Sequence, residues 1–201
     1  MTVTDSATNL KCVVVGDGGI GKTSMLLKYV NGRFMDEYIP TCFDNYTAVI
    51  DLEDRDINLN LVDTAGQETY DRLRTLSYFN TDVFIVCFSL VDPDSFINVK
   101  SRWIPELKEF KPGTPLILVG TKRDLRDENP NNTDVISYYK AKKTARRVGA
   151  GSYVECSAVT NDGLAEVFHQ ASVSALGIRK KKPFWSSLKR LFTPKKLTAR
   201  R

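Results

Sequence analysis

Short apolar runs alternate with helical patterns along this chain. Six of the runs predict strands, at residues 10–15, 48–52, 57–62, 83–88, 116–119 and 152–155. The first, fourth and fifth are continuously apolar and rich in β-branched residues, which is typical of parallel strands buried on both faces. The second and third flank a polar turn and predict a hairpin. The last is the weakest of the six.

Helical periodicity separates these runs. It predicts helices at residues 24–30, 94–110, 135–148 and 164–177. The Asp92-Pro93 pair resembles a helix N-cap followed by proline in the first turn. Strands that alternate with helices imply right-handed crossovers and a mostly parallel sheet covered on both faces. We therefore expect an α/β fold, with a six-stranded, mostly parallel sheet flanked by about five helices.

Composition indicates a globular protein, and charge divides it in two. The 201 residues are 42% apolar and 26% charged, which argues against a disordered or collagenous chain. Residues 1–178 hold 19 basic and all 24 acidic residues, whereas residues 179–201 hold ten basic residues. The net charge of +5 thus belongs to the tail and does not indicate a nucleic-acid partner. We expect a flexible N-terminus (1–9), one domain (10–178) and a basic tail (179–201).

The cysteines and the first residues indicate a reducing, cytoplasmic location. Cys12, Cys42, Cys87 and Cys156 form no C-x-x-C pair, and Cys12 and Cys87 lie in apolar runs that predict buried free thiols. The single histidine, His169, is expected on a helix surface. No secretory signal precedes the first strand, Thr2 does not fit the myristoylation motif, and no apolar run approaches about 18 residues.

The segment from Gly16 to Thr23 reads GDGGIGKT and matches the phosphate-loop pattern G-x-x-x-x-G-K-[ST] between a strand and a helix. Glycines let backbone N–H groups approach phosphates, and the helix adds its N-terminal amides. Lys22 is expected to bridge the outer phosphates, and the Thr23 hydroxyl to coordinate Mg²⁺. The alternative is a glycine-rich turn without a ligand. The predicted phosphate-binding residues are Gly18, Gly19, Gly21, Lys22, Thr23 and Ser24.

A second motif, DTAGQE from Asp63, follows the strand at 57–62. Asp63 is placed to reach the Mg²⁺ through a water, and Gly66 to offer its N–H to a terminal phosphate. Gln67 is suited to orienting a water rather than deprotonating it. With Lys22, these two residues form the predicted catalytic set; the alternative is a plain turn after a strand. The Thr41 hydroxyl is expected to complete the Mg²⁺ shell while a γ-phosphate is present, so that loss of the phosphate releases its loop.

The run Thr121-Lys-Arg-Asp124 follows the strand at 116–119. The Asp124 carboxylate can accept two hydrogen bonds from the N1–H and 2-amino groups of guanine, a donor pair that adenine lacks. The stem of Lys122 can lie across the base, and a backbone N–H of Ser157 or Ala158 can reach the guanine O6. The alternative for this motif is a surface salt bridge.

Together these motifs resemble the Ras superfamily of small GTPases over about residues 10–178. The stretches EYIPTCFDNY from Glu37 and DTAGQETYDRLR from Asp63 are most similar to the Rho family and are Rac-like. The resemblance implies a P-loop NTPase fold and a monomeric GTP/GDP switch that hydrolyses GTP with Mg²⁺ in cytoskeletal or membrane-linked signalling. It also implies that Phe34 packs on the guanine.

The same resemblance implies three classes of protein partner. Exchange factors, GTPase-activating proteins and effectors would bind from Tyr38 to Tyr46 and from Gln67 to Leu76. Three departures qualify this expectation. The segment between Asp124 and Cys156 is too short for the usual Rho insert, Val62 stands where Rac-like proteins have tryptophan, and no cysteine near Arg201 forms a prenylation box.

The tail carries its own pattern. Its apolar residues share one helical face between basic residues: Phe184, Trp185, Leu188, Leu191 and Phe192. A basic amphipathic helix with aromatic residues favours the interface of an anionic membrane. We expect peripheral association with the cytoplasmic face without a lipid anchor. The alternatives are a solvated tail, or a helix packed on the domain or on a partner.

Two other classes of function compete with a regulated GTPase. One is a nucleotide-loaded scaffold whose loops do not switch. The other is a P-loop kinase, but the chain lacks an arginine-rich lid segment, and a kinase leaves Asp124 and residues 63–68 unexplained. For a GTPase, turnover alone should be slow, because no arginine is evident at the site in the sequence.

Overall fold

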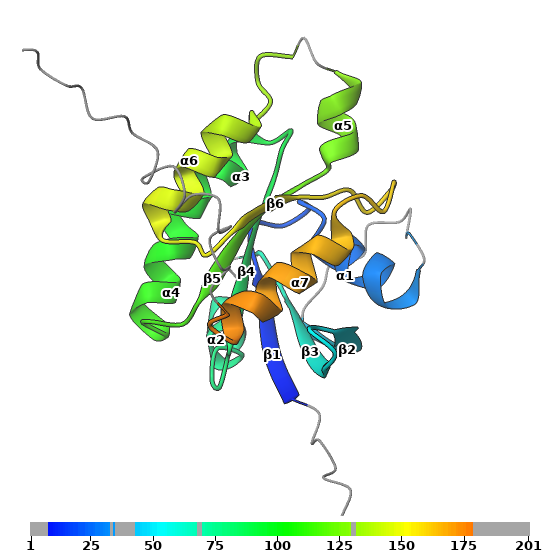
Figure 1. Cartoon of the computed structure of the whole chain (residues 1–201). Coiled ribbons are helices and arrows are strands. Elements are labelled where there is room, and N and C mark those ends of the chain that lie inside the picture. The colour runs from blue at the N-terminus through cyan, green and yellow to red at the C-terminus, as the bar shows by residue number, and fades with distance from the viewer. Residues whose placement is uncertain (1–7, 33, 35–42, 68–69, 130–131, 179–201) are drawn as a thin grey trace, which may run out of the picture.

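The computed structural model describes residues 8–32, 34, 43–67, 70–129 and 132–178. Six strands form one sheet in the order β2-β3-β1-β4-β5-β6 (Figure 1). Strands β2 and β3 are antiparallel and all other neighbours are parallel, which confirms the expected fold class. The strands are β1 (Thr8–Val15), β2 (Phe43–Asp51), β3 (Asp56–Thr64), β4 (Val83–Ser89), β5 (Leu116–Thr121) and β6 (Tyr153–Glu155).

Helices cover both faces of the sheet. Helices α1 and α7 pack on one face, whereas α3, α4 and α6 pack on the other (Figure 1). The helical segments are α1 (Lys22–Asn31), α2 (Asp71–Leu76), α3 (Pro93–Asn98), the π-helical η2 (Val99–Trp103), α4 (Ile104–Phe110), α5 (Arg123–Glu128), α6 (Tyr138–Val148) and α7 (Leu164–Ala175). Among the described residues, none of these helices is long and apolar enough to cross a membrane.

The two faces of β1 and β4 enter two separate apolar clusters. Cys12 and Val14 lie in the cluster beneath α1 and α7, whereas Val13 and Val15 lie in the cluster beneath α3, α4 and α6. Successive side chains on a strand point to opposite faces, so both faces must be apolar when both are covered. This burial explains the continuous apolar runs, and Cys12 and Cys87 are buried free thiols as predicted.

Several predicted element bounds were wrong. The helix predicted over residues 94–110 is interrupted by η2, and α6 begins at Tyr138 rather than at residue 135. The start of α6 follows from its cap, because the Ser137 hydroxyl accepts a hydrogen bond from the Lys140 amide at 3.3 Å. His169 is half-buried in α7 rather than placed on the helix surface.

Helices α2 and α5 were not predicted from the sequence at all. Their sequences, DRLRTL and RDLRDE, are polar and only six residues long, so neither carries an apolar stripe. Ion pairs with distant residues stabilise these two helices instead. Arg74 of α2 pairs with Glu106 on α4, and Arg126 of α5 pairs with Glu155 on β6. Such contacts leave no periodic signal in the sequence.

Candidate functional site

Four loops meet at one edge of the sheet. Strands β1, β3, β5 and β6 run parallel, so their carboxyl ends lie at the same edge, where ligands bind in open α/β sheets. The loop of residues 16–21 follows β1, and Asp63 lies at the end of β3. Residues 122–124 follow β5 and residues 156–158 follow β6. The predicted motifs are thus brought together by the sheet.

The glycine loop leads directly into α1. Gly21 has a φ of 97° immediately before Lys22, in the left-handed region that disfavours residues with a side chain. The Lys22 ammonium donates to the carbonyls of Gly16 at 2.8 Å and Asp17 at 2.6 Å. Lys22 is only 6% exposed, and burial lowers its pKa while the Asp63 carboxylate opposes that shift. The loop therefore holds a buried cation beside the first amides of the helix.

Thr23 and Asp63 place two oxygens side by side. The Thr23 hydroxyl donates to Oδ2 of Asp63, and Asp63 is fully buried. The end of β3 is anchored to β1, because the Thr64 hydroxyl donates to the Val14 carbonyl at 2.6 Å. Hydroxyl and carboxylate oxygens are the donors that Mg²⁺ prefers, so this pair fits the predicted ion.

Gly66 and Gln67 lie against the glycine loop. A Cβ added to Gly66 would overlap the backbone of Asp17 and Gly18, so only glycine permits this approach. Cγ of the exposed Gln67 would lie 3.9 Å from a Cβ placed on Gly18. Together with Lys22, the predicted catalytic residues are therefore neighbours around one loop.

The loop after β5 is joined to the glycine loop by two side chains. The Thr121 hydroxyl donates to the Ile20 carbonyl at 2.5 Å, and the Lys122 ammonium donates to the Gly19 carbonyl at 2.8 Å. Lys122 has a φ of 57°, an uncommon conformation for a residue with a side chain. Its ammonium bonds to Gly19, and the amide of the next residue, Arg123, bonds to Cys156. The lysine stem consequently spans the distance between the two loops.

Asp124 and residues 156–158 complete this end of the site. Asp124 is half-buried in the first turn of α5, and the neighbouring Arg123 amide donates to the Cys156 carbonyl at 3.1 Å. The amides of Cys156 and Ser157 donate to the carbonyls of Gly120 and Asp162 at 2.8 and 2.9 Å. These bonds fix the loop after β6 beside the start of α5.

The described residues do not include every residue of the predicted site. Thr41 and most of the stretch from Tyr38 to Tyr46 lie outside the described residues, as do residues 68–69. Phe34 is described and 38% exposed, and its contact with a base stays a prediction.

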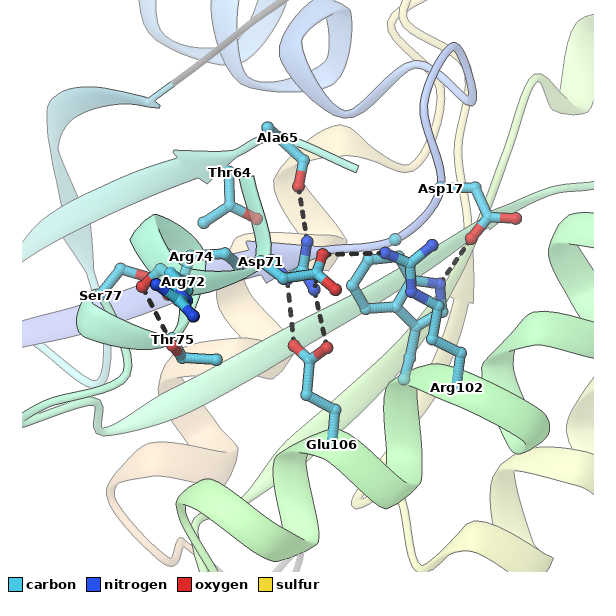
Figure 2. A network of polar contacts seen from close by, with 12 residues as sticks. Asp17, Thr64, Ala65, Asp71, Arg72, Arg74, Thr75, Ser77, Arg102 and Glu106 are labelled. Carbon is cyan, nitrogen blue, oxygen red and sulfur yellow. Dashed lines mark hydrogen bonds and ion pairs between the residues drawn. The ribbon is translucent and has the colours of Figure 1, made fainter. Parts of the chain in front are cut away.

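The sequence motifs did not mark three polar residues that the structure places at the site. Asp17 lies inside the glycine loop, Arg74 lies on α2, and Trp103 ends the π-helical turn. Arg74 is only 1% exposed and donates to the Ala65 carbonyl and to Glu106 (Figure 2). An aspartate among glycines was the one available signal, because the Asp17–Trp103 and Arg74–Glu106 contacts are long-range.

A family model supports the arrangement independently. The model described as the Ras family matches residues 11–176 of this chain. The match includes all four loops at the carboxyl edge of the sheet.

Proposed function

The chain belongs to the Ras family, and on that premise we propose that it is a Rho-like GTP/GDP switch that hydrolyses GTP. Membership implies a small GTPase with a GTP-binding switch domain that uses Mg²⁺. The Rho-like, Rac-like part of the proposal is supported by the residues FDNY at the start of β2 and by the DTAGQ and DRLR stretches around α2. A role in cytoskeletal or membrane-linked signalling comes with that likeness.

The observation that carries the proposal is the junction between the phosphate loop and the loop after β5. Lys122 and Thr121 donate to two carbonyls of the phosphate loop, so the groups for a base and the groups for phosphates form one continuous site. Asp124 would accept from guanine and the Lys122 stem would cover the ring. Because the amides of Cys156 and Ser157 donate to backbone carbonyls, the amide of Ala158 is our preferred donor to the guanine O6.

Phosphates would be bound by the amides of the glycine loop and the first turn of α1. The residues proposed here are Gly18, Gly19, Gly21, Lys22, Thr23 and Ser24. Mg²⁺ would be held by the Thr23 and Thr41 hydroxyls and, through a water, by Asp63, and when bound it neutralises charge on the phosphates. Lys22 would exchange its carbonyl partners for phosphate oxygens, an exchange that stronger charge-assisted bonds favour.

For hydrolysis, we propose that Gln67 orients the attacking water and that Gly66 donates its amide to the terminal phosphate. Arg74 is close to this segment, but its guanidinium is bound to Glu106, Asp71 and Ala65. It is not available to stabilise phosphate charge, so turnover alone should be slow and an activating protein should supply an arginine.

Partners would bind from Tyr38 to Tyr46 and from Gln67 to Leu76. The described part of this surface carries exposed apolar side chains, since Phe43 is 43% exposed, Leu73 is 54% exposed and Leu76 is 72% exposed. Exposed apolar groups of this kind mark interaction sites. Exchange factors, activating proteins and effectors are the classes that we propose for it, with the domain acting as a monomer.

We further propose that the tail, residues 179–201, attaches the 10–178 domain to anionic membrane at the cytoplasmic face. The support is its ten basic residues and its apolar pattern. Sedimentation of the full chain with phosphatidylserine vesicles tests this: Trp185→Glu should reduce binding strongly, while the matched Ser186→Glu, opposite the predicted apolar face, should reduce it little. Equal binding by all three proteins contradicts the proposal.

The switch itself is tested with the purified full chain. Wild type should bind fluorescent GDP and GTP in a Mg²⁺-dependent manner and hydrolyse GTP, and Gln67→Leu should bind equally but lose nearly all hydrolysis. Capture by a Rac- or Rho-binding effector fragment should favour the GTP-analogue form. Equal capture of both nucleotide forms would instead favour a scaffold, and hydrolysis unaffected by Gln67→Leu would remove that residue from the mechanism.

A further inference from the structure

A single turn of π-helix separates α3 from α4. The Ile104 amide donates to the Val99 carbonyl, five residues earlier, in place of the usual four. In an α-helix, residues five apart point about 140° apart around the axis, whereas a π-helical turn brings them nearly above one another. Asn98 directly precedes this turn and Trp103 is its last residue. The two are five residues apart, so both side chains can reach one partner.

That partner is Asp17 of the phosphate loop. Its Oδ2 accepts from Asn98 Nδ2 at 2.6 Å, and its Oδ1 accepts from Trp103 Nε1 at 2.7 Å. The carboxylate therefore has a donor on each oxygen, in short charge-assisted bonds. Trp103 is fully buried, so the phosphate loop is tied to a rigid part of the apolar core.

The same indole supports a second segment of the site. The guanidinium carbon of Arg74 lies 4.8 Å from the centroid of the Trp103 ring, and that of Arg102 lies 4.7 Å from it. Arg74 donates to Glu106 Oε2 at 2.7 Å and to the Ala65 carbonyl at 3.2 Å (Figure 2). Ala65 directly precedes Gly66 and Gln67.

One buried side chain thus contacts both halves of the site. Its N–H holds Asp17 in the phosphate loop, and its ring packs on the guanidinium that holds Ala65. The backbone of Gly66 packs so closely on Asp17 that a Cβ there would overlap the Asp17 backbone. Their relative position decides where Gln67 stands with respect to a terminal phosphate.

We propose that Trp103 is a positioning residue for GTP hydrolysis, acting through Asp17 and Arg74 to hold the Gln67 segment in register with the phosphate loop. The inference rests on the proposed function, since it requires the role given to Gln67. Small misplacements of reacting groups cost rate steeply, whereas the amides that bind phosphate do not contact Trp103. The effect should therefore fall on the hydrolysis step and not on nucleotide affinity.

Single-turnover GTP hydrolysis by the full chain tests this with three single variants. Trp103→Phe keeps a ring for Arg74 but removes the donor to Asp17. Asp17→Ala removes both oxygens that accept from Trp103 and Asn98. Ile104→Val shortens a buried side chain that makes no hydrogen bond in the network, keeps the backbone amide that closes the π-helical turn, and serves as the control for lost packing.

We expect Trp103→Phe and Asp17→Ala each to slow hydrolysis about tenfold, with GDP affinity within about threefold of wild type. The double variant should be slowed about as much as Asp17→Ala alone, because that change already removes the acceptor of the Trp103 N–H. Ile104→Val should hydrolyse GTP at the wild-type rate although its thermal stability falls.

Any one of three results would overturn this inference and leave the proposed function intact. They are a Trp103→Phe hydrolysis rate within about twofold of wild type, equal slowing of hydrolysis by Ile104→Val, or a double variant whose fold-loss in rate is the product of the two single losses. Each presupposes that wild-type hydrolysis depends on Gln67. Wild-type hydrolysis that Gln67→Leu leaves unchanged would contradict the proposed role of Gln67 first, so the two failures are distinguishable.

Discussion

The Thr23 hydroxyl oxygen lies 2.5 Å from Oδ2 of Asp63, although 40 residues separate them in the chain. Thr23 lies in the first turn of α1 and Asp63 lies near the end of β3, and the parallel pairing of β1 with β3 brings them together. Two oxygen donors from separate elements can hold one divalent cation between them. This relationship gives the first of five predictions.

Thr23→Val keeps the shape of the side chain and removes the hydroxyl. We expect the affinity for Mg²⁺ to fall at least about tenfold, since even groups that only orient a metal ligand contribute that much. The measurement is the Mg²⁺ midpoint for slowing the dissociation of fluorescent GDP. Thr47→Val on the exposed side of β2 is the matched control, and an unchanged midpoint in Thr23→Val would exclude its hydroxyl as a ligand.

Asp124→Asn should change which base is bound. The amide offers one acceptor and one donor, which suits the N1–H and 2-carbonyl of xanthine and leaves the 2-amino group of guanine facing a donor. GDP affinity should fall about 10- to 100-fold, because a buried donor left unpaired costs about 1–3 kcal/mol, and XDP affinity should rise. Competition of GDP and XDP against fluorescent nucleotide measures both. Asp127→Asn on the same helix should change neither, and unchanged preference in Asp124→Asn would contradict the assignment.

Arg74→Met should destabilise the domain strongly. The substitution keeps the buried stem but removes the cation from Glu106 and Asp71, and breaking a buried ion pair costs about 3–5 kcal/mol. Burial alone would lower the pKa of Arg74, but its interactions with Glu106 and Tyr78 raise that pKa above its ordinary value, so its charge is retained at every accessible pH. Urea unfolding measures the loss. Arg72→Met on the exposed side of α2 should stay within about 0.5 kcal/mol of wild type, and equal stability of both variants contradicts the prediction.

The buried thiols should resist alkylation in the native protein. Burial raises the pKa of Cys12 and of Cys156 to about 12, with smaller contributions from neighbouring carboxylates. At pH 8.5, iodoacetamide should therefore label these residues only after unfolding, as peptide mass mapping of native and urea-unfolded protein would show. Labelling of Cys12 in the native protein at the rate of a free thiol would refute this.

The raised pKa values of Cys12 and Cys156 also predict how the free energy of unfolding changes with pH. The folded pKa lies above the unfolded value of about 8.5, so the protonated thiols stabilise the fold fully below that value. The contribution is lost progressively as pH rises towards about 12. Cys12→Ala should accordingly flatten the alkaline fall in unfolding free energy relative to wild type.

Local sequence predicted most of the strands and the glycine loop of the candidate site. The strands at 83–88 and 116–119 were confirmed, because a strand buried on both faces must be continuously apolar. The phosphate loop was recognisable because glycines, lysine and threonine have a fixed spacing there. Helix α2 was missed, because its stability comes from the ion pairs of Arg74 and not from an apolar stripe.

The sequence by itself determined the α/β class and the phosphate-loop pattern, because each depends on neighbours within a few positions. Only the tertiary structure decided which polar groups meet. Asp17 and Trp103 are 86 residues apart, and their contact requires both the sheet order and a π-helical turn. A polar side chain takes its partner from whatever packing brings within hydrogen-bonding distance, and periodicity along the chain carries no record of that choice.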